Sequence, residues 1–126
     1  PRPDSTGPFS PPLPMADHSV KKIDSSASPT GEMGQTYLVS GTAVALRRWT
    51  ESAGTAGDPH TRPYETVGYV VSGKVEVHVG DDVITCGASD SYLVPEGATR
   101  HYKVLEDLTA IEATSPPARV DDRDDG

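Results

Sequence analysis

Hydrophobic and polar residues alternate along the middle of this 126-residue chain. In residues 74–79, valines at every second position face away from Lys74, Glu76 and His78. A period of two is typical of a β-strand with one buried face. The same pattern, with β-branched and aromatic residues, predicts further strands at residues 36–39, 42–49, 66–71, 83–86, 91–94, 101–105 and 108–113. Short strands without a helical period predict an all-β sandwich or barrel.

Strand parity also assigns side chains to faces, because residues two apart on a strand point the same way. Around the strand at residues 66–71 we expect His60, Arg62 and Thr66 on one side. The apolar residues on the other side are Val67, Tyr69 and Val71. In residues 42–49 one face holds Ala45, Arg47 and Trp49, and the other holds Val44, Leu46 and Arg48. His78 shares its face with charged residues, so we expect it to face solvent.

Residues that favour turns separate the predicted strands. Gly80 to Asp82 is typical of a β-hairpin, and Pro95 to Gly97 predicts a turn between two later strands. Ser72 and Gly73 indicate that the strand at residues 66–71 ends there in a turn.

The two ends of the chain differ in composition from the middle. Residues 1–14 are rich in proline and carry few residues that could form a core. We therefore expect residues 1–34 to be mostly disordered, although residues 20–23 could add a short edge strand. We expect residues 35–117 to form one barrel domain, as the size of the chain predicts. Residues 118–126 are mostly Asp and Arg and predict a disordered acidic tail.

The net charge of the chain disfavours two classes of partner. The chain carries a formal charge of -8, whereas nucleic acids and anionic membranes attract basic proteins. No apolar run is long enough to cross a bilayer, and the first residues lack the pattern of a signal peptide. The single cysteine, Cys86, excludes an internal disulfide. We expect a cytoplasmic protein that binds neither nucleic acid nor membranes.

Two segments carry a resemblance to a known family. The segment from Gly54 to Gly73, GTAGDPHTRPYETVGYVVSG, resembles the first cupin motif: Gly, five residues, His-x-His, three or four residues, Glu, six residues and Gly. Gly54, His60 and Gly73 keep this spacing. The second cupin motif contains Pro-x-Gly followed after two residues by His, and residues 95–97 match its Pro-x-Gly. The chain is therefore similar to small single-domain bacterial cupins over about residues 39–116.

This resemblance implies a fold and an assembly. Cupins form a double-stranded β-helix, which is a small all-β jelly-roll barrel. They often pair through outer sheet faces or by exchanging N-terminal strands. We therefore expect a homodimer that covers the outer apolar residues Val67, Tyr69 and Val71, or that pairs residues 20–23 across subunits.

The resemblance also implies where a metal would sit. Cupins commonly hold one divalent metal with three His and one Glu, but only His60 is retained here. Arg62, Thr66 and Arg100 occupy the other three positions. Arginine is cationic and is not a metal ligand, so we predict that no metal cofactor is bound.

An alternative uses residues one place away. His60, Glu65 and His101 are two His and one carboxylate, which is a valid set for one divalent transition metal ion. This site requires two strands to shift by one residue so that Glu65 and His101 turn inward. Pro63 and the turn after Pro95 could each allow a bulge.

A pocket for an anion is the other interpretation. Arg62 and Arg100 would then bind a carboxylate or phosphate of a small-molecule ligand. The further candidate ligand-binding residues are His60, Tyr64, Thr66, Tyr92 and His101, and Tyr102 could also line the mouth. Alternatively, Arg62 pairs with Glu65 or Glu112 at the barrel rim and has no chemical role.

Three functions therefore stay open at this point. The first is a cupin that binds a small molecule, with an anion pocket. The second is a metal-dependent cupin enzyme of the oxygenase, isomerase or epimerase type that uses His60, Glu65 and His101. The third is a structural or regulatory module. The residues identify neither the ligand nor a reaction.

Overall fold

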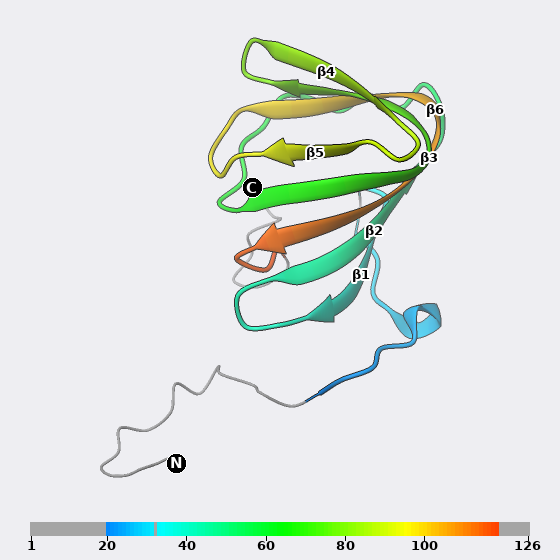
Figure 1. Ribbon diagram of the computed structural model, residues 1–126, viewed down its shortest axis with the longest axis vertical. Coiled ribbons are helices and arrows are strands. Elements are labelled where there is room, and N and C mark those ends of the chain that lie inside the picture. The colour runs from blue at the N-terminus through cyan, green and yellow to red at the C-terminus, as the bar shows by residue number, and fades with distance from the viewer. Residues whose placement is uncertain (1–19, 32, 119–126) are drawn as a thin grey trace, which may run out of the picture.

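The structure is a computed structural model, and it describes residues 20–31 and 33–118. A short 3-10 helix, η1 (Ser25–Ala27), precedes the strands β1 (Gln35–Ser40), β2 (Ala45–Glu51), β3 (Glu65–Val79), β4 (Asp82–Gly87), β5 (Ser91–Val94) and β6 (Arg100–Ser115). They form a six-stranded sheet in the order β1-β2-β6-β3-β4, and β5 also pairs with β3. Every pairing is antiparallel. Figure 1 shows the sheet curling on itself.

The pairing of β3 with β6 runs the whole length of both strands. Glu65 lies opposite Ser115 at one end, and Val79 lies opposite Arg100 at the other. The register shifts between Val70 and Val75, about halfway along. Such bulges bend a strand and increase its twist, and Figure 1 shows both strands curving through the same bend. Each strand thereby contributes to both walls of the curled sheet.

This bend corrects the prediction at Ser72 and Gly73. The strand does not end there in a turn; β3 continues through both residues to Val79. Gly73 has φ of +93°, a conformation that a residue with a Cβ adopts only under strain. The glycine therefore forms part of a bulge. Residues 101–105 and 108–113, which were predicted as two strands, are likewise continuous in β6.

Other predictions about local structure can be compared directly. The hairpin at Gly80 to Asp82 is confirmed, since Val79 pairs with Asp82 and the two strands continue as β3 and β4. Residues 20–23 form no strand within the chain, and Val20 is fully exposed. The predicted disordered ends fall largely on residues 1–19 and 119–126, which lie outside the described residues. Among the residues that are described, no helix is long and apolar enough to cross a membrane.

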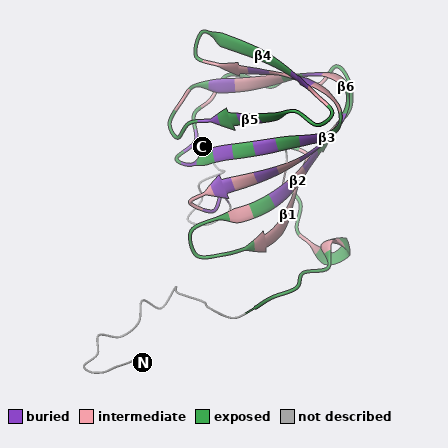
Figure 2. Cartoon of the chain, in the orientation of Figure 1, coloured by how far each residue is buried: buried purple, intermediate pink, exposed green. Residues whose placement is uncertain are grey.

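Burial alternates along the strands, as Figure 2 shows for β3. The inner face of the sheet holds the hydrophobic core, which includes Trp49, Val70, Val75, Val77, Cys86, Tyr92, Val94, Val104, Leu108 and Ala110. On the outer face, Val67, Tyr69 and Val71 are each about half exposed. The homodimer expected to cover them stays a prediction.

We predict that Gly73→Ala destabilises the fold. A Cβ at Gly73 would collide with the backbone carbonyl of Asp107 on β6, and the positive φ adds strain. Together these effects should lower the free energy of unfolding by about 2 kcal/mol or more. Urea unfolding measures this loss. The control is Gly57→Ala, where a Cβ would meet nothing within 4 Å; equal stabilities of the two variants would contradict the prediction.

Candidate functional site

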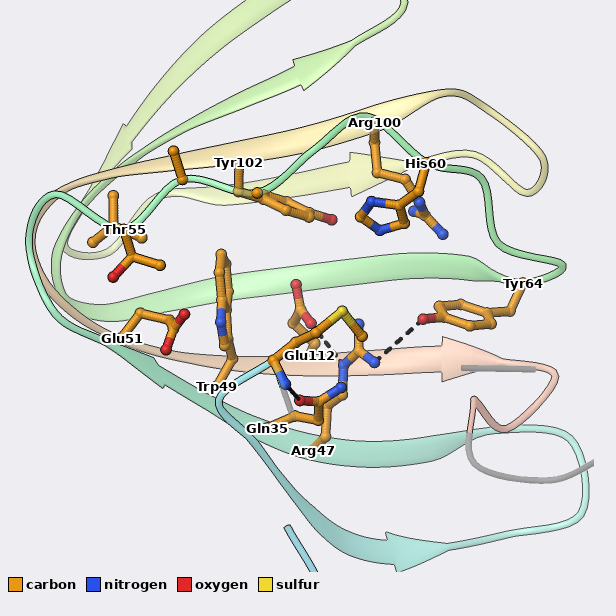
Figure 3. Close-up of a pocket in the computed structure, with 14 residues that line it drawn as sticks. Gln35, Arg47, Trp49, Glu51, Thr55, His60, Tyr64, Arg100, Tyr102 and Glu112 are labelled. Carbon is orange, nitrogen blue, oxygen red and sulfur yellow. Dashed lines mark hydrogen bonds and ion pairs between the residues drawn. The ribbon is translucent and has the colours of Figure 1, made fainter. Parts of the chain in front are cut away.

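A pocket of about 250 Å³ opens into the interior of the barrel. Its walls come from β1, β2, β6 and the loop between β2 and β3. The lining residues are Met33, Gln35, Arg47, Trp49, Glu51, Thr55, Ala56, Gly57, His60, Tyr64, Arg100, Tyr102, Val104 and Glu112. Figure 3 shows these side chains converging from opposite walls.

One wall follows directly from strand parity. Arg47, Trp49 and Glu51 alternate along β2, and all three side chains line the pocket. The strand β2 lies between β1 and β6, and Arg47 is opposite Glu112 in the register with β6. The inner face of β2 therefore presents a cation, an aromatic ring and a carboxylate in succession.

The facing wall is built from the start of β6 and the loop that precedes β3. Backbone hydrogen bonds connect the two: Gly57 N–H donates to the Tyr102 carbonyl, and His60 and Arg100 exchange a pair of bonds. The Tyr102 ring meets Trp49 edge to face at 4.9 Å between centroids. This contact places Trp49 and Tyr102 in the middle of the pocket, between an end at Arg100 and an end at Glu51 (Figure 3).

Arg47 and Glu112 form a buried ion pair in the pocket wall. The Arg47 Nε lies 2.8 Å from Glu112 Oε1. Tyr92 donates its hydroxyl hydrogen to the other carboxylate oxygen. Burial first, and then the charge of Glu112, raise the pKa of Tyr92 well above its ordinary value, so the phenol keeps its proton. Glu112 is thus satisfied on both oxygens.

Tyr64 connects this ion pair to the end of the pocket near Arg100. Its hydroxyl oxygen accepts a hydrogen bond of 3.3 Å from Arg47 Nη1. Its ring lies beneath two guanidinium groups, with the Cζ of Arg47 at 5.5 Å and that of Arg100 at 5.4 Å from the centroid. Cations over an aromatic face attract its negative quadrupole. The Tyr64 ring therefore contacts the guanidinium groups of both Arg47 and Arg100.

The guanidinium group of Arg100 is buried without hydrogen-bond partners for its nitrogen atoms among the described residues. The residue is 1% exposed, and Nε, Nη1 and Nη2 all lack a hydrogen-bond partner among the described residues. A guanidinium group stays charged at any working pH. Burying a charge without hydrogen bonds or a counter-charge is costly, so Arg100 is the first candidate in this pocket for contact with a ligand.

Two further side chains could hydrogen-bond a ligand near Arg100. His60 Nδ1 lies 2.8 Å from the Asp58 carbonyl oxygen. Since that oxygen can only accept, Nδ1 carries the hydrogen. At Tyr102, burial first and then the charge of Glu112 raise the pKa, so its hydroxyl is protonated at neutral pH.

The structure brings only some of the predicted ligand residues together. His60, Tyr64 and Arg100 line the pocket. Arg62 is buried but lies outside the lining, where it contacts the Met33 sulfur at 3.6 Å and the Thr61 carbonyl at 3.3 Å. Thr66 and Tyr92 are also buried inside the barrel without lining the pocket. Arg62 is therefore not next to Arg100 in the lining of this pocket, and its predicted role in binding an anion stays a prediction.

His101 lies on the outer face of the sheet. Its ring stacks on that of His78, directly across the β3–β6 pair, at 4.2 Å between centroids. His78 also lies 3.0 Å from Glu76 and is half-buried. His78 therefore points outward as predicted, but it packs against His101 instead of standing free in solvent. His101 is therefore not part of the pocket lining.

The alternative metal set is not assembled. Glu65 is exposed at the start of β3 and His101 is on the outer face, so neither joins His60. The required one-residue shift is absent because Thr66 and Arg100 keep the inward positions. No group of three or more His, Cys, Asp or Glu in residues 20–31 and 33–118 is placed to hold a metal ion.

The positions that carry the metal in the cupin motif also fit a cation poorly. Only His60 has the chemistry of a ligand. Arg62 and Arg100 are buried guanidinium groups that repel a divalent ion, and Thr66 supplies a neutral hydroxyl. Of these four positions, His60 alone offers a divalent ion a ligand atom of the usual kind.

Sequence reasoning missed several residues of the site. Glu112 pairs with Arg47, and not with Arg62 as one interpretation held. Glu51 and Trp49 complete the wall. One signal was present: Arg47 alternates in phase with Trp49, the only tryptophan, and a charged residue on the face of a large aromatic residue indicates a buried pair or a pocket. The partner, Glu112, could not be inferred from this pattern.

The fold agrees with what known proteins show. A family model described as "Cupin domain" matches residues 47–112, just over half of the chain. The chain belongs to the cupin family. The double-stranded β-helix expected for this cupin is confirmed. Among curated proteins, no match was found.

Solved structures with the same fold cover most of the cupin chain. An RmlC-like cupin from Shewanella frigidimarina is 22% identical, with a TM-score of 0.70 over 82% of this chain and 96% of that one. KdgF from a Halomonas species is also 22% identical, with a TM-score of 0.70 over 82% and 98%. A predicted oxalate decarboxylase from Thermotoga maritima is 15% identical, with a TM-score of 0.60 over 75% and 98%. At these identities the likeness shows the fold alone.

We predict that Glu112→Gln strongly destabilises this cupin. The change leaves Arg47 buried without its counter-charge, which should lower the free energy of unfolding by about 3 kcal/mol. Denaturant unfolding measures the difference. Glu106→Gln is the matched control, since its pair with Lys74 is 3.6 Å long and largely exposed and should contribute less than about 1 kcal/mol. Similar losses in the two variants would show that the Arg47–Glu112 pair is not special.

Proposed function

We propose that this cupin binds a small organic anion, with Arg100 as the residue that binds the negative group. The observation that carries the proposal is the buried guanidinium of Arg100, which has no hydrogen-bond partner among the described residues. A carboxylate or phosphate accepts parallel hydrogen bonds from such a group and neutralises its charge. A ligand of this kind removes the cost of burying Arg100.

The side chains around Arg100 favour the same occupant. Tyr64 lines the pocket with its ring against Arg100, and Arg47 donates to its hydroxyl oxygen. Tyr102 lines the same pocket as a protonated phenol. The Arg47–Glu112 pair is internally neutral, which leaves Arg100 as the source of net positive charge at this end.

The size and walls of the pocket support a small ligand. A volume of about 250 Å³ is below the roughly 300–1,000 Å³ typical of sites for drug-sized molecules. Trp49 and Tyr102 give the middle of the pocket an aromatic surface. The occupant we propose therefore has one anionic group and a short carbon skeleton.

A metal-dependent reaction is not supported by a specific observation. The residues named for it, His60, Glu65 and His101, do not lie together. The proposed binding function requires no metal, because Arg100 supplies the positive charge.

We predict that small carboxylates or inorganic phosphate stabilise the protein and that Arg100→Met abolishes this effect. Ligand at a hundred times Kd should add about 2.7 kcal/mol to the free energy of unfolding. Without ligand, Arg100→Met should be as stable as the wild type or more so, because it replaces a buried unpaired charge with an apolar side chain of similar length. Thermal unfolding with acetate, malonate and phosphate measures both effects.

Arg48→Met serves as the control for this experiment. Arg48 is adjacent to Arg47 on β2, but its side chain belongs to the outer face and is not part of the pocket lining. The Arg48→Met variant loses the same charge as Arg100→Met but should retain the full stabilisation by anions. Loss of the response in both variants, or in neither, would contradict a specific role for Arg100.

A further inference from the structure

The pocket has a second end whose charge is opposite to that of Arg100. Glu51 lines this end, two residues after Trp49 on β2. In the described part of the chain, its carboxylate makes no hydrogen bond or ion pair with another side chain. Burial raises the pKa of Glu51 above its ordinary value, since partial removal of water disfavours the charged form.

Local packing holds the Glu51 side chain over the pocket. A Cβ built on Gly34 would lie 2.6 Å from Glu51 Oε1, so the carboxylate rests against the backbone of that glycine. The Gly34 carbonyl in turn accepts a hydrogen bond from Thr50 N–H. Figure 3 shows Glu51 beside Thr55, on the far side of Trp49 from Arg100. The carboxylate therefore lies against the backbone at this end of the pocket.

The space between the two ends suits a ligand that reaches both. Arg47 and Glu51 are four residues apart on β2, which is about 13 Å between their Cα atoms, and both side chains line the pocket. Arg100 lies with Arg47 over the Tyr64 ring. The Trp49 ring lies between, and the face of an indole attracts cations. A positive group at this point would contact both the ring and the Glu51 carboxylate.

The geometry points to a dipolar ligand: an ω-amino acid whose carboxylate binds Arg100 and whose ammonium group binds Glu51 beside Trp49. This inference rests on the proposed binding of an anion at Arg100 and adds the chemistry of the distal end. A ligand of this class neutralises both partly desolvated charges at once. A plain carboxylate leaves Glu51 without a counter-charge.

The test compares ω-amino acids with carboxylic acids of the same carbon chain. Glycine, β-alanine, γ-aminobutyrate and δ-aminovalerate are each titrated by calorimetry against the full chain, beside acetate, propionate, butyrate and valerate. We expect affinity in the amino series to peak at one chain length. At that length the amino acid should bind at least about tenfold more tightly than the matched acid, as a partly buried ion pair with cation–π contact implies.

The variant Glu51→Gln locates the effect. It should remove the preference for the amino acid and leave the affinity for the matched acid within about twofold of the wild type. Trp49→Phe keeps an aromatic ring and should reduce the preference only in part. Arg100→Met should abolish binding of both series, because both depend on the carboxylate.

Each outcome separates this inference from the proposed function. Wild-type protein that binds plain acids as tightly as amino acids overturns the dipolar ligand while leaving anion binding intact. A preference that survives in Glu51→Gln also overturns it, since the ammonium group would then bind elsewhere. If neither series binds the wild type, anion binding at Arg100 fails and the dipolar ligand fails with it.

Discussion

The continuous pairing of β3 with β6 is the constraint on which the site depends. It sets Glu65 against Ser115 and Val79 against Arg100, and through strand parity it decides which side chains enter the barrel. A shift of one residue would bring Glu65 and His101 inward and turn Thr66 and Arg100 outward. The bulges near Gly73 bend the pair and reverse the parity of β3 at that point: the buried residues are Thr66 and Val70 before the bend and Val75 and Val77 after it. The choice between a metal set and a guanidinium group is thus made by register.

Electrostatics then distinguishes the two buried arginines that line the pocket. Arg47 is balanced by Glu112, which in turn accepts a hydrogen bond from Tyr92. In that network the positive and negative charges balance each other. Its hydrogen bonds position this wall of the pocket and the Tyr64 hydroxyl. Arg100 has the same charge and greater burial but no such partner in the described chain. A buried charge that the protein does not balance favours balance by a ligand.

The sequence predicted the strands and their faces well because these depend on local alternation. Val67, Tyr69 and Val71 are on the outer face and Thr66 is on the inner face, as the period of two required. The turn assigned to Gly73 was wrong for a tertiary reason: a glycine with positive φ serves a bulge as readily as a turn, and pairing with β6 decides between them. Motif spacing placed Arg100 inside the barrel correctly.

The composition of the pocket was harder to predict, because its partners are distant in sequence. Arg47 and Glu112 are 65 residues apart, and no periodicity indicates that one would neutralise the other. Glu51 was missed for the same reason. It lies two residues beyond Trp49, but it lines a pocket only because the folded chain brings the loop at Thr55 beside it.

In the cupin motif a metal would bind a ligand's oxygen atoms directly, whereas Arg100 can bind them only through hydrogen bonds. Hydrogen bonds to a planar guanidinium group orient a carboxylate but do not polarise it as a metal ion does. The retained His60 pairs through its backbone with Arg100, a group suited to recognition, and this arrangement supports the proposed binding function.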